Sequence, residues 1–391
     1  MKERNNHENI AVDDVENIPI TSEVIEKPKR NWKIWKKDKS QDGQPRVRRI
    51  KTNDLSESSK KSMLTRVISA IVGLAIIIPA IFIGDWIYFG VVSVALVFAC
   101  YEILGCTNKR TIVTVLVYFI FVALITYWPI FRMMVPPNVP EIYSIGYYYK
   151  EICLPILVVI GGSFLVFFLT VVYKDFTVQD ACYLIAMAII VGLGFQCLFY
   201  LRYYPNNYPS VPNFNDWQFT AENTVKPSLL LIFVIFSTFM TDTGAYFVGV
   251  FFGKNKINER ISPHKTWEGF VGGIVISFLF SSALGLTLAS ITGADGASWS
   301  IHPNITLQEQ WYLILILSLL IPLFATLGDF VFSSIKRYWG IKDYGILIPG
   351  HGGVLDRLDS IIFAVIITSI FIHMLSVIKV GEAFDWSKFL V

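Results

Sequence analysis

Nine long apolar runs constrain this chain more than any other feature of its sequence. A helix needs about 20 mainly apolar residues to cross a bilayer. Runs of this kind occupy residues 67–84, 86–104, 111–131, 152–173, 179–201, 228–252, 268–292, 310–332 and 359–380. Because backbone N–H and C=O groups cannot be left unpaired in lipid, such runs must be helical. The sequence therefore predicts an all-α, polytopic integral membrane helix bundle with about nine transmembrane helices.

The few charged residues are unevenly distributed along the chain. They make up only 16% of it, against about 25% in soluble domains, so a water-soluble globule is excluded. Between Lys27 and Lys51 there are eleven Lys or Arg residues and two acids. We therefore predict three regions: a basic, disordered cytoplasmic tail at 1–66, N-terminal membrane helices at 67–227, and a C-terminal membrane catalytic region at 228–391.

The short loops between the runs predict the orientation of the bundle. Cytoplasmic loops carry an excess of Lys and Arg, and a cytoplasmic tail followed by nine spans puts the most basic loops on one side. These cytoplasmic loops contain Lys109, Arg110, Lys174, Lys254, Lys256, Arg260, Lys265, Lys336, Arg337 and Lys342. The opposite loops contain fewer cations, and residues 293–309 contain none. The two most polar loops are thus both expected to face the cytoplasm.

Two acids stand out inside the apolar runs. Asp242 lies in the sixth run and Asp329 near the end of the eighth, and ionisable residues within spans are costly and usually functional. On a helix, Asp329, Ser333 and Lys336 fall at i, i+4 and i+7 and share one face. That face would present a carboxylate, a hydroxyl and an ammonium group to the cytoplasmic mouth. The simpler alternative is that Lys336 neutralises Asp329 as a packing pair.

The loop that follows combines cations, acids and a glycine-rich turn. It reads SSIKRYWGIKDYGILIPGHGGVLDRLDS from Ser333. In PGHGG, the glycines predict a tight turn whose backbone amides can approach an anion closely, and His351 could bond a phosphate or a base edge. Asp356 and Asp359, at i and i+3, would share a helix face. Carboxylates of this kind suit Mg²⁺, which takes one or two of them together with substrate phosphates and water.

The other polar cytoplasmic loop leads into the seventh span. Ser262 and Pro263 are interpreted as the entry to that helix, which would put Glu268 near its first turn, where the helix dipole favours an acid. Lys265 beside free helix amides would then make a phosphate site. For Thr266 and Glu268, helix capping is an equally good interpretation.

These features together favour one class of chemistry. Several cations, metal-binding acids and a glycine-rich turn are what phosphoryl or nucleotidyl transfer requires, because that catalysis is mainly positioning and neutralisation of negative charge. The position of the residues at the membrane surface indicates a lipid phosphate as one substrate.

The same residues resemble a known family. SSIKR, KD, PGHGG and DRLD, at their separations between Ser333 and Asp359, are similar to the signature of the CDP-diacylglycerol synthases, also called phosphatidate cytidylyltransferases. The block TDTGAYFVGVFFGKNKINERISPHKTWEGFVGG resembles the family's more N-terminal conserved region. The resemblance covers about residues 228–380. It implies conversion of CTP and phosphatidate to CDP-diacylglycerol and pyrophosphate, a step of phospholipid biosynthesis.

The resemblance also implies cofactors, partners and roles for individual residues. It implies Mg²⁺, a monovalent cation such as K⁺, contact with membrane lipid, no nucleic acid and a possible homodimer. Asp329 and Asp356 are the expected metal ligands, and Asp359 is a third ligand or an acid behind them. The expected phosphate ligands are Lys265, Lys336, Arg337, Lys342 and Arg357, with His351 as an orienting donor. Ser262, Ser333, Gly352, Gly353 and Asp242 are expected to contact substrate, Asp242 in a substrate channel or at a helix break.

Two other functions are weighed against this interpretation, and two cellular locations are considered. A transporter would use Asp242 and Asp329 as cation relays on broken helices, but leaves the PGHGG loop unexplained. A CDP-alcohol phosphotransferase would need a closely spaced DG and AR motif, which is missing from the sequence. The bacterial plasma membrane is the expected location, with the endoplasmic reticulum as the alternative.

Overall fold

The computed structural model describes residues 57–107, 110–128, 154–203, 225–258, 260–291, 301, 311–350 and 352–377. The tail up to residue 56 and His351 lie outside these residues, so the predictions made for them are not addressed by the structure. The predicted end of the tail at residue 66 is wrong, because residues 57–66 are helical. Nine helices lie in the described part: α1 (Glu57–Ile83), α2 (Asp85–Thr107), α3 (Ile112–Thr126), α6 (Leu154–Val172), α7 (Val178–Tyr203), α8 (Val225–Phe252), α9 (Trp267–Ser290), α10 (Trp311–Tyr338) and α11 (Leu355–Val377).

The helices coincide with the nine apolar runs, which confirms the predicted all-α membrane bundle. Seven of the described helices are long and apolar enough to cross a membrane. The remaining two have shorter apolar stretches, Ile71–Ile83 in α1 and Ile112–Thr126 in α3. The chain is therefore a membrane protein that crosses the bilayer several times.

A tight turn joins the first two helices. α1 ends at Ile83 and α2 begins at Asp85, and Gly84 between them has a φ of 73°. Glycine adopts this left-handed backbone without the penalty that a Cβ would add. The end of α1 is held from two later helices, since Arg202 Nε and Ser228 Oγ each donate to Ile81 O at 2.9 Å.

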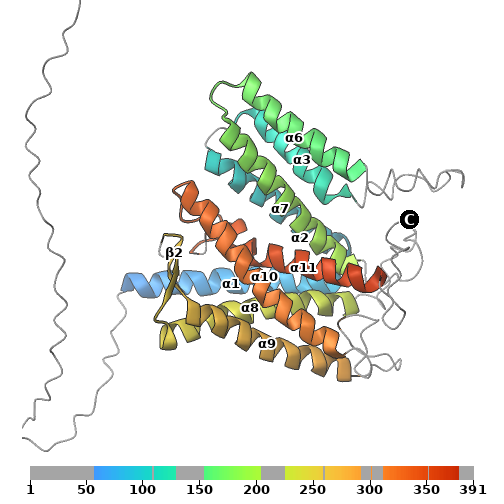
Figure 1. The fold of residues 1–391 in the computed structure, drawn as a ribbon, viewed down its shortest axis with the longest axis vertical. Helices are drawn as coiled ribbons and strands as arrows, with labels where there is room; N and C mark the ends of the chain where they lie inside the picture. Colours follow the sequence, from blue (N-terminus) through green and yellow to red (C-terminus); the bar gives the residue numbers. More distant parts are fainter. Residues whose placement is uncertain are drawn as a thin grey trace, which may run out of the picture. The chain divides into compact units, whose positions relative to one another are not determined.

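The helices pack in two groups (Figure 1). The first contains α2, α3, α6 and α7, and the second contains α8 to α11. α7 joins them, because it packs against α8 and α11 as well as its own group. At that junction, a Cβ on Gly194 would lie 2.7 Å from Ile362 Cγ2, so the α7 and α11 backbones approach closely. The predicted boundary at residues 227/228 falls between the groups and stays a prediction.

α8 and α9 lie side by side over most of their lengths (Figure 1). The contact uses small residues: a Cβ on Gly273 would lie 2.8 Å from Thr241 O, and Ser237 Oγ lies 3.1 Å from Ser277 Oγ. Small side chains allow such close backbone approach in membranes. The closely packed α8–α9 pair forms one wall of the hairpin pocket described below.

A short two-stranded hairpin precedes α9, where the sequence was expected to be helical. β1 (Lys256–Asn258) pairs antiparallel with β2 (Ser262–Thr266). The prediction that Ser262 and Pro263 begin the helix is therefore wrong, because they pair with β1 in an extended strand.

The N-terminus of α9 confirms the capping interpretation. Thr266 is the N-cap, and its Oγ1 accepts a hydrogen bond from Gly269 N at 3.1 Å. Glu268 lies in the first turn, as predicted, and its carboxylate accepts from Lys254 N at 3.1 Å and Asn255 Nδ2 at 2.7 Å. Glu268 therefore fixes the chain just before β1.

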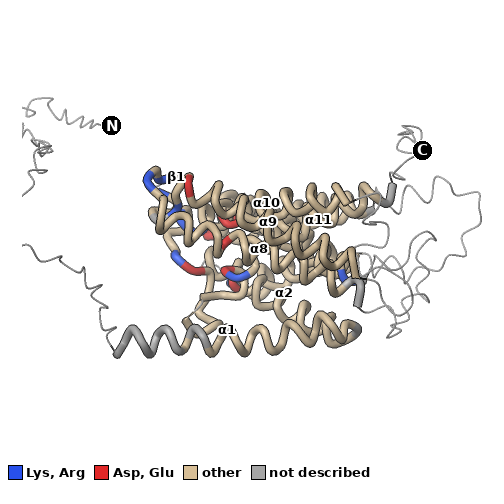
Figure 2. The backbone as a smooth tube through the Cα atoms, turned by 90° about the horizontal axis from the view of Figure 1, so that it is seen from below, with Lys and Arg blue, Asp and Glu red and all other residues tan. Residues whose placement is uncertain are grey.

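Charged residues gather at one end of the bundle. Figure 2 shows most of the Lys, Arg, Asp and Glu residues of the described part at the end where β1 lies. The two polar loops that the sequence placed on one side, residues 253–266 and 339–354, both lie at this end. The loops and helix ends there form the candidate site.

Candidate active site

The first element of the site is an ion pair between β2 and α10. Lys265 Nζ donates to Asp329 Oδ2, and Ser333 Oγ donates to Asp329 Oδ1 at 3.2 Å. The Lys265 ammonium also lies 4.3 Å from the ring centroid of Phe330. The Lys265 and Asp329 side chains are 29% and 27% exposed, so a ligand can reach both.

The second element is a buried ion-pair group between α10 and α11. Lys336 Nζ lies 2.9 Å from Asp356 Oδ1 and 3.6 Å from Asp359 Oδ2. The predicted common face of Asp356 and Asp359 is confirmed. The alternative that Lys336 neutralises Asp329 is wrong, because the partner of Asp329 is Lys265, 64 residues away in the sequence. Lys336 instead binds the first two turns of α11.

Asp356 also organises the loop between α10 and α11. Its Oδ2 accepts from Tyr344 N at 2.8 Å and from Gly353 N at 2.9 Å. Burial raises the pKa of Tyr344, so its hydroxyl remains protonated and donates to Phe332 O at 3.3 Å. One carboxylate thus ties together α10, α11 and both ends of the loop.

The predicted tight turn at PGHGG is present. Ile348 N donates to Gly352 O at 2.8 Å, and Gly352 N donates back to Ile348 O at 3.2 Å. Gly350 and Gly352 have φ values of 75° and 88°, which residues with a Cβ rarely adopt. α1 contacts the turn, because Ser69 Oγ donates to Pro349 O at 3.0 Å.

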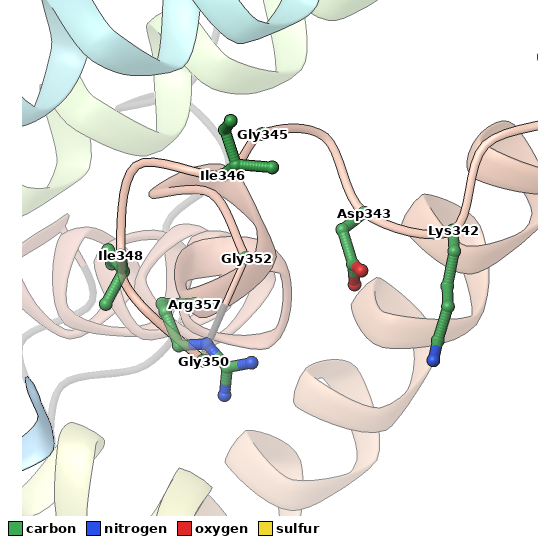
Figure 3. A pocket seen from close by; sticks show the side chains of 8 residues that line it. All are labelled: Lys342, Asp343, Gly345, Ile346, Ile348, Gly350, Gly352 and Arg357. Atoms are coloured by element: carbon green, nitrogen blue, oxygen red, sulfur yellow. The ribbon is translucent and has the colours of Figure 1, made fainter. Parts of the chain in front are cut away.

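A pocket of about 500 Å³ opens beside this turn (Figure 3). We call it the turn pocket, and it is lined by Lys342, Asp343, Gly345, Ile346, Ile348, Gly350, Gly352 and Arg357. Lys342 and Asp343 come from the loop after α10, and Arg357 comes from the first turn of α11. Two cations and bare glycine backbone suit an anionic ligand.

A second pocket, of about 580 Å³, lies between α8, the β-hairpin, α9 and α10. We call it the hairpin pocket. Its lining combines charged groups with large apolar side chains: Thr241, Asp242, Ala245, Tyr246, Gly249, Val250, Lys256, Ile257, Lys265, Thr266, Gly269, Phe270, Thr326, Asp329 and Phe330. Tyr246 and Val250 are also exposed on the outer surface of α8. The pocket therefore offers a charged end and an apolar wall to one ligand.

Three acids of the site come from three different helices, α8, α10 and α11. Asp242 interacts electrostatically with Asp329 and Lys265 of the hairpin pocket and with Arg357 of the turn pocket. Asp359, in turn, interacts with both Asp329 and Asp242. Asp242 and Asp329 both line the hairpin pocket, and the α11 backbone at Asp359 packs against Gly328, the residue before Asp329.

The described acids can hold a divalent cation only together with ligands from the substrates and water. Within the described residues, no group of three or more His, Cys, Asp or Glu side chains is placed to hold a metal by itself. Mg²⁺, however, is usually held by one or two carboxylates together with substrate phosphates and water. Asp329 fits that role, since it is partly exposed and lies near Asp242 and Asp359. At Asp356, both oxygens already accept hydrogen bonds, so a metal would have to displace Lys336.

Ser262 and Arg337 line neither of these pockets, and the same holds for three other residues predicted to contact substrate or phosphate: Ser333, Lys336 and Gly353. Ser262 is paired within the β-hairpin. Arg337 donates from Nε to Ile261 O at 3.2 Å and from Nη1 to Ile341 O at 3.1 Å. In the structure, Arg337 connects the hairpin to the loop after α10. The roles predicted for these residues stay predictions, as does that of His351.

Glu102 of α2 belongs to the site and was missed in the sequence. Its carboxylate accepts from Val354 N and Leu355 N, each at 2.8 Å, at the start of α11. The residue is only 5% exposed. It is the one charged residue in the apolar run 86–104, so the rule that singled out Asp242 and Asp329 would also have found it.

Comparisons with known proteins show which proteins this chain is similar to. A protein of Staphylococcus saprophyticus named phosphatidate cytidylyltransferase is 33% identical over 205 residues, which is 52% of this chain and 64% of the relative. A protein of the same name from Staphylococcus aureus is 34% identical with the same coverage. The match thus spans less than two thirds of the length of these curated relatives.

A longer match covers most of the bundle. A phosphatidate cytidylyltransferase of Staphylococcus haemolyticus is 28% identical over 302 residues, which is 77% of this chain and 95% of the relative. The sequence pattern of the cytidylyltransferase family matches residues 64–375, from α1 into α11. The resemblance stated from the sequence motifs is confirmed, and the chain belongs to the cytidylyltransferase family.

Proposed function

We propose that this chain is a phosphatidate cytidylyltransferase, which converts CTP and phosphatidate to CDP-diacylglycerol and pyrophosphate. The observation that carries the proposal is the presence of two pockets of different chemistry at the charged end of the bundle (Figure 2), one of which is lined by Asp242 and Asp329. A polar, cationic pocket suits a soluble triphosphate, and a pocket with a charged end and an apolar wall suits a lipid phosphate. The names of the staphylococcal relatives support the same reaction.

In this proposal the turn pocket holds the triphosphate of CTP. Lys342 and Arg357 neutralise its charge, and the backbone at Gly350 and Gly352 leaves room for close approach. Arg can present two N–H groups to one phosphate, which fixes orientation as well as charge.

The hairpin pocket holds phosphatidate. Its phosphate lies at Lys265 and Lys256, and the proximal parts of its acyl chains contact Val250, Phe270 and Phe330. The exposed outer face of α8 allows the remaining acyl carbons to stay in the bilayer. Phosphatidate binding requires Lys265 to exchange Asp329 for the lipid phosphate, which releases an Asp329 oxygen.

The chemistry is an in-line displacement at phosphorus. An oxygen of the phosphatidate phosphate attacks the α-phosphorus of CTP and forms a P–O–P linkage. The bond from the α-phosphorus to its bridging oxygen breaks, and pyrophosphate leaves with the electron pair. No protein nucleophile is needed, so the chain's residues position the two substrates and offset charge. Lys342 and Arg357 lie on the pyrophosphate side, and Lys265 lies on the attacking side.

We also propose that the reaction uses Mg²⁺, with a monovalent cation such as K⁺ as a second ion. Asp329 would hold Mg²⁺, with Asp242 and Asp359 as neighbouring acids and the substrate phosphates as further ligands. When bound, Mg²⁺ would neutralise charge that develops on the phosphate oxygens.

The proposed location is the bacterial plasma membrane, with the site facing the cytoplasm. The basic loops at the β1 end of the bundle support this orientation, and CTP is a cytoplasmic metabolite. We propose a homodimer from the family resemblance. Cross-linking in native membranes, with a monomer as the contrary result, tests the dimer.

The test of the function is direct. Purified full-length protein is mixed with CTP, phosphatidate and Mg²⁺ in detergent micelles, and CDP-diacylglycerol and pyrophosphate are measured. Equal amounts of both products support the proposal, and neither product would reject it. Release of CMP from CDP-diacylglycerol and an added alcohol would instead indicate a CDP-alcohol phosphotransferase, and cation flux in liposomes would indicate a transporter.

A further inference from the structure

Glu102 joins the first group of helices to the site by two hydrogen bonds. Its Oε1 accepts from Val354 N and its Oε2 from Leu355 N, each at 2.8 Å. These amides lie at the N-terminus of α11, where helix N–H groups have no partner within the helix. A carboxylate there also interacts favourably with the helix dipole. Glu102 therefore fixes the start of α11 from α2.

Two glycines of the loop pack directly on the same carboxylate. A Cβ on Gly345 would lie 2.6 Å from Glu102 Oε1, and a Cβ on Gly353 would overlap the carboxylate. The loop therefore approaches Glu102 at two points, before and after the tight turn. No larger residue fits at either point unless Glu102 moves.

These contacts connect Glu102 to the turn pocket. Gly345 lines that pocket, and Gly353 N donates to Asp356, which holds Lys336. Arg357, one of the two cations of the pocket, follows Leu355 by two residues, so the orientation of the first turn of α11 sets the position of its side chain. The turn pocket is thus held in shape by the carboxylate of Glu102, although Glu102 itself does not line the pocket.

We propose that Glu102 is a positioning residue that shapes the turn pocket for the nucleotide. It acts through the loop and the α11 N-terminus, and it does not touch the substrate. This inference rests on the proposed function, because it assigns CTP to the turn pocket. A residue with this role affects the KM for CTP more than the KM for phosphatidate, whose pocket is built from α8, α9, α10 and the hairpin.

The decisive variant is Glu102→Gln, which keeps the shape of the side chain. Its single amide oxygen can accept from one of the two backbone amides, and its NH2 group opposes the other. The expected result is a rise of about 10-fold to 100-fold in the KM for CTP, the range for loss of a hydrogen bond to a charged group. The KM for phosphatidate should change less than about 2-fold. Glu102→Asp keeps the charge and should recover part of the loss.

Asp180→Asn is the matched control. Asp180 is also a buried acid, 3% exposed, at a helix N-terminus, and its Oδ2 accepts from Thr177 N at 2.8 Å and from Thr177 Oγ1 at 2.7 Å. It caps α7, its own helix. Asp180→Asn should lower the melting temperature as Glu102→Gln does, but it should leave the KM for CTP unchanged.

The experiment measures both KM values and the melting temperature for wild type and variants in the same detergent. Equal KM values for CTP in Glu102→Gln, Asp180→Asn and wild type would overturn the positioning role. Should Glu102→Gln fail to fold, Gly345→Ala provides the second test, because its methyl group displaces the carboxylate from the other side. An unchanged KM for CTP in Gly345→Ala would also overturn the role. An inactive wild-type protein would reject the proposed function itself, so the two failures are distinguishable.

Discussion

Lys336 Nζ is 2.9 Å from Asp356 Oδ1, and both side chains are nearly inaccessible, with 10% and 3% exposure. By contrast, Lys265 and Asp329 form an ion pair that is more than a quarter exposed. A buried charge left without its partner is strongly destabilising, whereas an exposed pair contributes little to stability. The two pairs therefore have different consequences when they are broken.

Removal of Lys336 should destabilise the protein more than neutralisation of Asp356. Lys336→Met leaves the Asp356 and Asp359 carboxylates without their cation, at a cost of about 3–5 kcal/mol. Asp356→Asn leaves Lys336 paired with Asp359 and keeps one acceptor oxygen for the loop amides, so it should cost roughly 1–3 kcal/mol. Unfolding in mixed-detergent titrations gives both values. The reverse order would show that Lys336 does not balance both acids.

Neutralisation of Asp329 should remove activity without unfolding the protein. Asp329→Asn breaks the exposed pair with Lys265, which is worth only about 0–1 kcal/mol. If Asp329 holds Mg²⁺, turnover should fall at least ~100-fold, as it does when a group that stabilises transition-state charge is lost. Initial rates over a range of Mg²⁺ concentrations, with the melting temperature, provide the check. Near-normal turnover would remove Asp329 from the proposed metal site.

Removal of either cation of the turn pocket should weaken CTP binding specifically. Arg357→Met and Lys342→Met should each raise the KM for CTP by about 10-fold to 100-fold, since each removes a charge-assisted contact to phosphate. Lys254→Met makes the same charge change at an exposed residue outside both pockets and serves as the control. An equal effect in all three variants would indicate a general loss of positive potential and not a specific site.

Deletion of residues 1–50 should leave catalysis intact. All residues that line the two pockets, and Glu102, lie between positions 102 and 357. We therefore expect kcat within about 2-fold of the full-length value, because none of these contacts is removed. Rates per mole of membrane-inserted protein test this. A large loss of kcat would assign the tail a catalytic role.

The helices of this fold could be predicted because lipid imposes a simple rule on them. Each run long enough to span had to be helical, and the first two runs are separated by one residue, Asp85, which leaves room only for a tight hairpin. The β-hairpin was not predictable in the same way. Ser262–Thr266 is short, polar and contains Pro263, and its extended form depends on pairing with Lys256–Asn258.

The sequence singled out some of the residues that line the two pockets, among them Asp242, Asp329 and Arg357, but not how the charged residues pair. The glycine turn and the common face of Asp356 and Asp359 follow from local spacing, which the sequence contains. The partner of Asp329 depends on how β2 meets α10, and no local pattern reveals that Lys265 will be there. The partners of Glu102 are backbone amides, and no pattern of side chains in the sequence marks them as its partners. Its role became visible only with the structure.

The two hydrogen bonds of Glu102 also have a consequence for insertion of the chain into the membrane during synthesis. Glu102 precedes Val354 by 252 residues and Leu355 by 253. Ribosomes synthesise the chain from its N-terminus, so α2 enters the membrane long before its two amide donors exist. An acid in a span without a partner is costly in lipid. A chain interrupted before α11 therefore keeps this cost and lacks Arg357 of the turn pocket, and the candidate site is complete only when α11, the last described helix, is inserted.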